Sequence, residues 1–206
     1  MKKVYDIGMY GNALDYLQFL IYRMNSCKDL LSDILIDKTP KYKYTIDNYH
    51  HFMVEYKDTK TKYEFEYLDF LMNYLPEYFG LRDCDVDFDF VDGKITFEDK
   101  INKNELIETV ELENSEEIDL LYHLSIDKSV FDEILNSVII NRKSNYALNM
   151  EIYNEFIKEY NEITNQYNSL FYKILADYAP EYKSDDYYAI IDINHLKLDV
   201  YKEERV

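Results

Sequence analysis

Aspartates stand at alternate positions in one short segment, and this spacing is the first in the sequence that could support chemistry. Asp85, Asp87 and Asp89 are separated by single apolar residues. Because successive side chains of a β-strand point to opposite faces, the three carboxylates would form a row that repeats every ~6.7 Å. Such a row could hold metal ions for phosphoryl transfer or present a line of negative charge to a basic partner. It does not fit a calcium-binding EF-hand, because the sixth and twelfth positions counted from Asp85 hold Phe90 and Thr96 instead of glycine and glutamate.

A second group of carboxylates lies near the middle of the chain, where Lys and Arg are absent between Asn104 and Asp127. With the three aspartates, these glutamates are our candidate partner-binding residues: Glu108, Glu111, Glu113, Glu116 and Glu117. Residues 1–103 hold 19 acidic and 14 basic residues, a net charge of −5, whereas residues 104–206 hold 22 and 9, a net charge of −13. Crowded like charges cost stability, so the pattern indicates either a surface that maintains solubility or one that pairs with Lys and Arg of a partner.

The histidines and cysteines form no recognisable catalytic set. His50 and His51 are adjacent, which points their rings apart on a helix, whereas a metal-binding pair on one helix needs i, i+4 spacing. Two cysteines, Cys27 and Cys84, give no disulfide framework and fit a reducing cytosol. Acidic neighbours make Cys84 a poor nucleophile. We therefore expect no catalytic residue, no cofactor and no metal site, and a binding protein in preference to an enzyme.

Composition limits the classes of partner. The 206 residues carry 23 Lys and Arg against 41 Asp and Glu, a net charge of −18, which disfavours direct binding of nucleic acid or anionic lipid. No apolar run of 18 residues occurs, so we expect no membrane span. Lys2 and Lys3 are followed by Asp6 and Gly8, unlike a signal peptide, so a cytoplasmic protein is expected. Only 4 Gly and 3 Pro favour long helices.

The sequence repeats itself with a shift of 104 positions. Residues 14–78 align with residues 118–182 without a gap, and Tyr74-Leu75-Pro76-Glu77-Tyr78 aligns with Tyr178-Ala179-Pro180-Glu181-Tyr182. Because the match includes one of the 3 prolines, chance similarity in a Tyr-rich chain is a poor explanation. The repeat predicts a tandem duplication, with one copy in residues 1–103 and the other in 104–206, related by an approximate two-fold axis.

Each copy is expected to fold as strand, helix, helix, strand, strand, which makes the protein α+β. We predict a strand over residues 4–10, then a helix capped by Asn12 and broken near residue 26, with a matching break near residue 129. Aromatic residues three and four apart over residues 49–74, repeated over 153–178, predict a long amphipathic helix in each copy that ends before Pro76 or Pro180. Alternating apolar residues around Asp92-Gly93, and again around Asn194-His195, predict a hairpin at the end of each copy.

The combination of acidity, small size and absent catalytic motif favours a binding function. We expect an inhibitor that imitates nucleic-acid phosphates and occupies the basic groove of a nuclease or similar nucleic-acid-binding protein. In size and composition the chain resembles phage-encoded anti-defence factors, including inhibitors of CRISPR nucleases, which implies action in the host cytoplasm. The 23 tyrosines suit a wet interface, and both a monomer with internal pseudo-symmetry and a homodimer stay open.

Three alternatives remain. An immunity protein against a basic toxin would show the same acidity. A metal-dependent phosphoryl-transfer enzyme would use Asp85, Asp87 and Asp89 as ligands. A scaffold protein would self-associate through tyrosine-rich surfaces.

Overall fold

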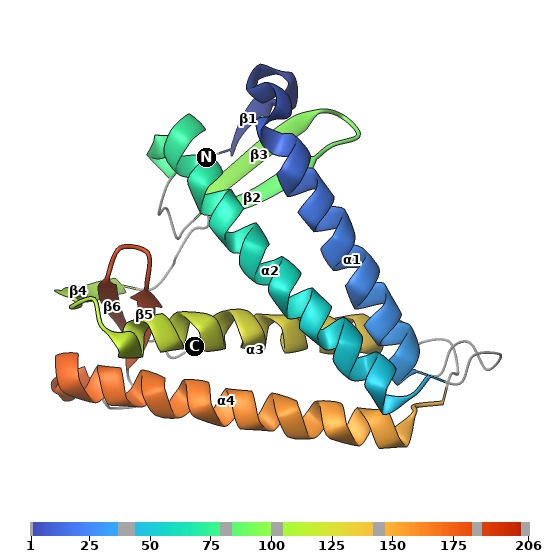
Figure 1. The fold of residues 1–206 in the computed structure, drawn as a ribbon. Helices are drawn as coiled ribbons and strands as arrows, with labels where there is room; N and C mark the ends of the chain where they lie inside the picture. The colour runs from blue at the N-terminus through green and yellow to red at the C-terminus, as the bar shows by residue number, and fades with distance from the viewer. Residues whose placement is uncertain are drawn as a thin grey trace. The chain divides into compact units, whose positions relative to one another are not determined.

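The fold is a mixed α+β structure. The computed structural model describes residues 2–36, 44–78, 84–99, 105–141, 147–182 and 187–202. Within these ranges there are four long helices (Figure 1): α1 (Asp15–Leu35), α2 (Ile46–Tyr74), α3 (Glu116–Asn141) and α4 (Met150–Tyr178). None of the helices in the described ranges has a stretch long and apolar enough to cross a membrane.

The described strands form two antiparallel sheets of three strands each. Their bounds are β1 (Lys2–Asp6), β2 (Cys84–Asp89), β3 (Lys94–Asp99), β4 (Glu105–Glu111), β5 (Tyr187–Asp192) and β6 (Lys197–Lys202). The strand orders are β1-β3-β2 and β4-β6-β5, so in each sheet the last strand of the hairpin lies in the centre.

The chain divides into two compact units. The helical unit comprises residues 15–68 and 123–167, and the sheet unit comprises residues 1–14, 69–122 and 168–206. Both units take segments from both halves of the sequence, so this division differs from the predicted one at residues 103 and 104. That predicted boundary lies outside the described residues, and the assignment of 1–103 and 104–206 as separate copies stays a prediction.

Aromatic side chains fill the core of the helical unit. Tyr49 and Tyr56 of α2 are 0% and 1% exposed, and Phe131 of α3 and Phe156 of α4 are both 0% exposed. Tyr49 and Tyr56 are seven residues apart, two helical turns, so they lie on one face of α2. The first part of the aromatic stripe predicted for this helix, Tyr49 to Tyr63, therefore belongs to or packs on a core shared with helices from the second half of the chain, whereas Tyr74 at its end is 49% exposed.

The buried tyrosines are held by carboxylates of other helices. The Tyr49 hydroxyl donates to Glu159 Oε2 of α4 at 2.9 Å, and the Tyr56 hydroxyl donates to Glu133 Oε2 of α3. Burial and the adjacent carboxylates raise the pKa of both phenols, so they stay protonated as donors. A leucine could fill the same space without satisfying these carboxylates.

Lysines of α2 continue the same pattern. Lys57 Nζ lies 3.2 Å from Asp127 Oδ2 and 5.0 Å from the centre of the Phe131 ring. Lys60 Nζ lies 3.0 Å from Glu133 Oε1. Donors from the first half thus meet acceptors from the second half along this face of α2.

Both long aromatic helices end where the sequence predicts. One residue after the end of each helix, a proline begins a short 3₁₀ turn. These turns are η2 (Pro76–Tyr78) after α2 and η4 (Pro180–Tyr182) after α4, with Leu75 and Ala179 between helix and turn. At its start α2 has a reciprocal cap, in which Thr45 N donates to Asn48 Oδ1 at 3.1 Å and Asn48 N donates to Thr45 Oγ1 at 3.4 Å.

The predicted helix breaks do not occur. α1 and α3 run without interruption through Ser26 and Ser129. The Ser26 hydroxyl donates to the Tyr22 carbonyl at 2.9 Å, and the Ser129 hydroxyl donates to the Ile126 carbonyl at 2.8 Å. Each serine therefore satisfies its hydroxyl inside its own helix and caps no new one.

The predicted strand over residues 4–10 is shorter and begins earlier. β1 ends at Asp6, whose Oδ1 accepts a hydrogen bond from Gly8 N at 2.8 Å. A 3₁₀ segment over Ile7–Leu14 follows, interrupted at Gly11 with a φ of 52°. Asn12 lies in this segment and does not cap α1, which begins at Asp15.

Both predicted hairpins are confirmed, with longer turns than expected. Asp89 pairs with Lys94 and Asp192 pairs with Lys197, so four residues form each loop. Asp89 Oδ1 accepts hydrogen bonds from Val91 N at 3.0 Å and from Asp92 N at 2.9 Å. Gly93 closes the first loop with a φ of 67°, a conformation that favours glycine.

Each sheet has one buried face. In the first sheet Ile95 and Phe97 of β3 are 0% and 1% exposed, and the Phe97 ring stacks on Tyr78 with centroids 3.9 Å apart. In the second sheet Leu198 and Val200 of β6 are both fully buried. In each sheet the central strand thus supplies the alternating apolar residues that its position requires.

Replacing Tyr56 with Phe tests the tyrosine–carboxylate contact. The ring stays in the core while Glu133 loses a charged hydrogen bond, so we expect the free energy of unfolding to fall by about 1–2 kcal/mol. Urea denaturation followed by circular dichroism measures this, with Tyr172→Phe as the matched control because Tyr172 is 64% exposed. Equal losses in the two variants would contradict the assignment.

Candidate functional site

The predicted aspartate row lies on edge strand β2. Asp87 is exposed there, Asp89 is half-buried, and the side chain of Asp85 lies outside the part of the chain that the structure describes. Across the sheet Asp87 faces Thr96 and Asp89 faces Lys94 on the same side of β3. Because the Asp89 carboxylate also holds the turn, Asp87 is the described member of the row most available to a partner.

The predicted glutamates lie on β4 and at the start of α3. Glu108 and Glu111 are exposed, yet a register shift between Leu106 and Glu108 places Glu108 opposite Val200 and Glu111 opposite Lys197. Three residues apart on a strand, Glu108 and Glu111 point to opposite faces of the sheet. Edge strand β4 therefore presents acidic groups on both sides.

Glu111 Oε1 lies 3.8 Å from Lys197 Nζ, and two more of these glutamates have partners within the sheet unit. Glu108 Oε2 accepts a hydrogen bond from the Tyr182 hydroxyl at 2.9 Å, and this bond raises the pKa of Tyr182. Glu117 forms an ion pair with Lys173 of α4. These contacts lie at the surface, where such pairs contribute little to stability and can be exchanged for a partner's cations.

The acids at the start of α3 also have a local structural role. The first turn holds Glu116, Glu117 and Asp119, while Ser115 accepts a hydrogen bond from Ile118 N at 3.4 Å. Carboxylates near a helix N-terminus interact favourably with the helix dipole. Part of the acidic crowding therefore stabilises this helix. Glu113, before the helix, and Glu116, its first residue, are both exposed.

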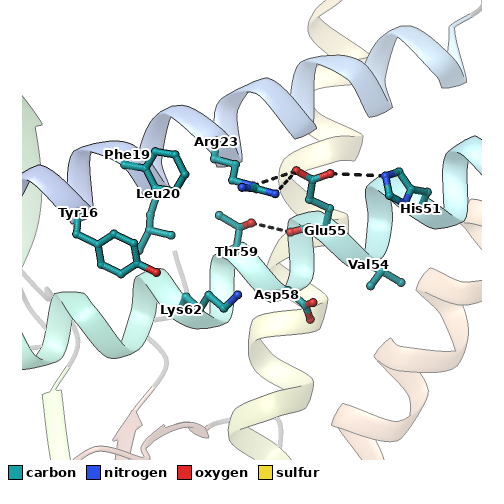
Figure 2. Close-up of a pocket in the computed structure, with 10 residues that line it drawn as sticks. All are labelled: Tyr16, Phe19, Leu20, Arg23, His51, Val54, Glu55, Asp58, Thr59 and Lys62. Atoms are coloured by element: carbon teal, nitrogen blue, oxygen red, sulfur yellow. Dashed lines mark hydrogen bonds and ion pairs between the residues drawn. The ribbon is translucent and has the colours of Figure 1, made fainter.

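A separate groove of about 370 Å³ lies between α1 and α2 in the helical unit, and Figure 2 shows its lining. Its residues are Tyr16, Phe19, Leu20, Arg23, His51, Val54, Glu55, Asp58, Thr59 and Lys62. Arg23 Nη2 lies 2.8 Å from Glu55 Oε1, and His51 Nε2 lies 3.9 Å from Glu55 Oε2. Figure 2 shows these charged groups converging on Glu55 at one end of the groove.

The other end of this α1–α2 groove is aromatic. Tyr16 and Phe19 are 45% and 51% exposed, and their rings stack with centroids 6.1 Å apart. The Thr59 hydroxyl is occupied by a 2.7 Å hydrogen bond to the Glu55 carbonyl. Exposed aromatic rings beside an arginine are typical of protein-binding surfaces, so the groove is better suited to recognition than to bond-breaking chemistry.

One set of potential metal ligands comes together in the described residues: His50 of α2 with Glu155 and Glu159 of α4. A groove of about 230 Å³ adjoins it. The set was not predicted from the sequence, because His50 was considered as a metal ligand only together with His51 on the same helix. The available signal was the i, i+4 spacing of Glu155 and Glu159, which places them on one helix face.

Comparison of the chain with protein-family models, curated protein sequences and solved structures finds no match. The resemblance to anti-defence factors therefore rests on size and composition alone. Function has to be argued from the surfaces described above.

Cys27 is unsuited to catalysis. Its side chain is 3% exposed, and burial, reinforced by the nearby Glu55 carboxylate, raises the pKa of the thiol to about 11. A raised pKa leaves little of the reactive thiolate at neutral pH. The structure thus places this thiol in the helical core.

Thiol labelling tests this placement. A Cys84→Ser variant leaves Cys27 as the sole cysteine of the chain. We expect it to react with Ellman's reagent at pH 7 at least about a hundredfold more slowly than a small-molecule thiol, and at an ordinary rate in denaturant. Rapid reaction of the native protein would show that Cys27 is accessible, contrary to the structure.

Proposed function

We propose that the protein inhibits a nucleic-acid-handling protein by placing acidic strand β4 and the start of α3 in its basic groove. The observation that carries this proposal is the segment from Asn104 to Asp127, which contains no Lys or Arg. Its exposed carboxylates lie on adjoining elements: Glu105, Glu108, Glu111, Glu113, Glu116 and Asp119. A basic groove built for phosphates would pair with such carboxylates.

The acids of the second half fall into two groups, and this division supports the choice of surface. Asp127, Glu133 and Glu159 accept hydrogen bonds or ion pairs from α2 inside the helical unit. The β4 carboxylates face outward, since six of the seven residues of β4 are exposed. Other acids of the second half, such as Glu151 and Glu162, are also exposed. The β4 carboxylates differ from them because the segment that holds β4 has no Lys or Arg.

Apolar groups accompany the charge on β4. Leu106 and Ile107 are 51% and 39% exposed on this edge strand. Carboxylates give orientation and a fast association rate, whereas buried apolar contacts slow dissociation. The proposed surface offers both.

We also propose that the chain arose by tandem duplication and that its second copy became specialised for this role. In support, α2 and α4 each have 29 residues, and the two sheets have equivalent strand orders. The edge strands differ in charge: Lys2 of β1 pairs with Glu98, whereas Glu105 of β4 pairs with Lys202. At this pair the acid therefore lies on the central strand of the first sheet and on the edge strand of the second.

The partner class follows from the proposed chemistry. A nuclease of a prokaryotic defence system, including a CRISPR nuclease, has the basic groove that this surface would fill, and inhibition would take place in the host cytoplasm. An immunity protein against a basic toxin would use the same acids, so the identity of the captured protein separates the two. The hydrogen bonds that hold the Asp89 carboxylate in the β2–β3 turn weigh against a phosphoryl-transfer site at Asp85, Asp87 and Asp89.

Matched charge-neutralised variants test the surface. Wild type, a triple variant Glu108→Gln, Glu111→Gln, Glu113→Gln and a control Asp29→Asn, Glu66→Gln, Asp69→Asn are immobilised and exposed to bacterial lysate. We expect wild type and control to capture a basic protein that nucleic acid displaces. Affinity of the first variant for that protein should fall at least about tenfold. The loss of its affinity with added salt should be less steep than that of wild type, because three charged contacts are removed.

Two results would overturn the proposal. One is equal weakening of both triple variants, which would mean that net charge alone matters. The other is binding indifferent to salt and to competing nucleic acid.

A further inference from the structure

We propose that His50, Glu155 and Glu159 form a binding site for a divalent transition-metal ion of the Zn²⁺ class between α2 and α4. Both helix segments belong to the helical unit, and the site is separate from the acidic surface on β4. The inference is therefore independent of the proposed inhibitory function.

The donor geometry already approaches that of a bound ion. One ligand atom from each of the three side chains lies within 4.8 Å of the others, and His50 Nδ1 is 3.5 Å from Glu159 Oε1. Two ligands at about 2.0–2.2 Å from a tetrahedral Zn²⁺ stand roughly 3.4 Å apart. The His50–Glu159 pair thus has the required spacing, and a Glu155 carboxylate oxygen lies within 4.8 Å of both donors.

The negative charges of Glu155 and Glu159 also favour binding of a cation. Glu155 and Glu159 lie one turn apart on α4, where like charges destabilise a helix. Lys158 Nζ is 3.4 Å from Glu155 Oε1, but the lysine side chain is 63% exposed and compensates weakly. A metal ion bound by both carboxylates would remove their repulsion.

A buried hydrogen bond orients one of the ligands. The Tyr49 hydroxyl donates to Glu159 Oε2 at 2.9 Å, which leaves Oε1 directed toward His50. Tyr49 is fully buried, so its ring is held in the core behind this carboxylate. Such a donor behind a metal-binding carboxylate fixes its position, which makes Tyr49 a positioning residue.

The donor set and the adjoining groove indicate which metal and what coordination. An imidazole nitrogen with two carboxylates suits Zn²⁺ better than Mg²⁺ or Ca²⁺, which take oxygen ligands almost exclusively. Three protein ligands leave a fourth position of a tetrahedral ion open. The adjoining groove of about 230 Å³, lined by Met53, Lys57 and Gln166 among others, has room for a water molecule or a small ligand there.

Calorimetric titration with Zn²⁺ alone, on full-length protein without a tag and stripped with chelator, tests the site. We expect saturable binding of one ion per chain, undiminished by a large excess of Mg²⁺. Affinity should fall at least about a hundredfold in His50→Ala and in Glu155→Gln, and about 10–100-fold in Tyr49→Phe. The Tm of wild type should rise with Zn²⁺, and that of His50→Ala should not.

Matched controls come from the same surfaces. His51→Ala removes a neighbouring histidine that is 73% exposed and outside the site, and Glu162→Gln removes a carboxylate from the same groove. Both should bind Zn²⁺ like wild type. The Glu155 carboxylate pairs with the exposed Lys158, so Glu155→Gln should fold normally, as circular dichroism would verify. Absence of saturable binding, or equal affinity in Glu155→Gln and wild type, would overturn the site.

Discussion

The helical unit depends on hydrogen bonds between donors on α2 and carboxylates on the helices of the second half. Tyr49 and Tyr56 place their rings in the core and their hydroxyls on Glu159 and Glu133. Each tyrosine therefore fills apolar space and satisfies a carboxylate at once, which neither leucine nor phenylalanine can do. The need to satisfy a carboxylate at the edge of the core explains why tyrosine occupies these positions. The same hydrogen bonds connect the first half of the chain to the second.

The same constraint changes how the net charge of −18 should be understood. Carboxylates such as Asp127 and Glu133 belong to internal contacts, so their charge is already balanced by Lys57 and Lys60. Such pairs leave the net charge unchanged, so the excess of acids lies in the remaining carboxylates. Exposed acids lie on most of the described elements. β4 and the start of α3 differ from the others because the segment from Asn104 to Asp127 has no Lys or Arg, and this local absence of base favours a basic partner.

Local signals in the sequence predicted the elements that depend on local physics. The aromatic stripe, the prolines at positions 76 and 180 and the alternating strands gave α2, α4 and both hairpins close to their observed bounds. Ser26 failed as a break signal because a serine hydroxyl can either cap a new helix or bond back within the existing one. The His50–Glu159 contact could not be predicted from the sequence, because the two residues are 109 positions apart and no spacing rule links them.

Under the proposed duplication, the candidate metal site lies where the two copies diverged. Position 23 holds Arg, which pairs with Glu55, whereas position 127 holds Asp, which pairs with Lys57. Glu159 is the counterpart of Glu55, but the residue equivalent to its arginine partner is the acid Asp127. Glu159 instead contacts Tyr49 and His50 of the other half. One change of charge therefore converts a contact within a copy into a contact between copies. Glu155, at the position of His51, supplies the third ligand, so the site requires both halves of the chain.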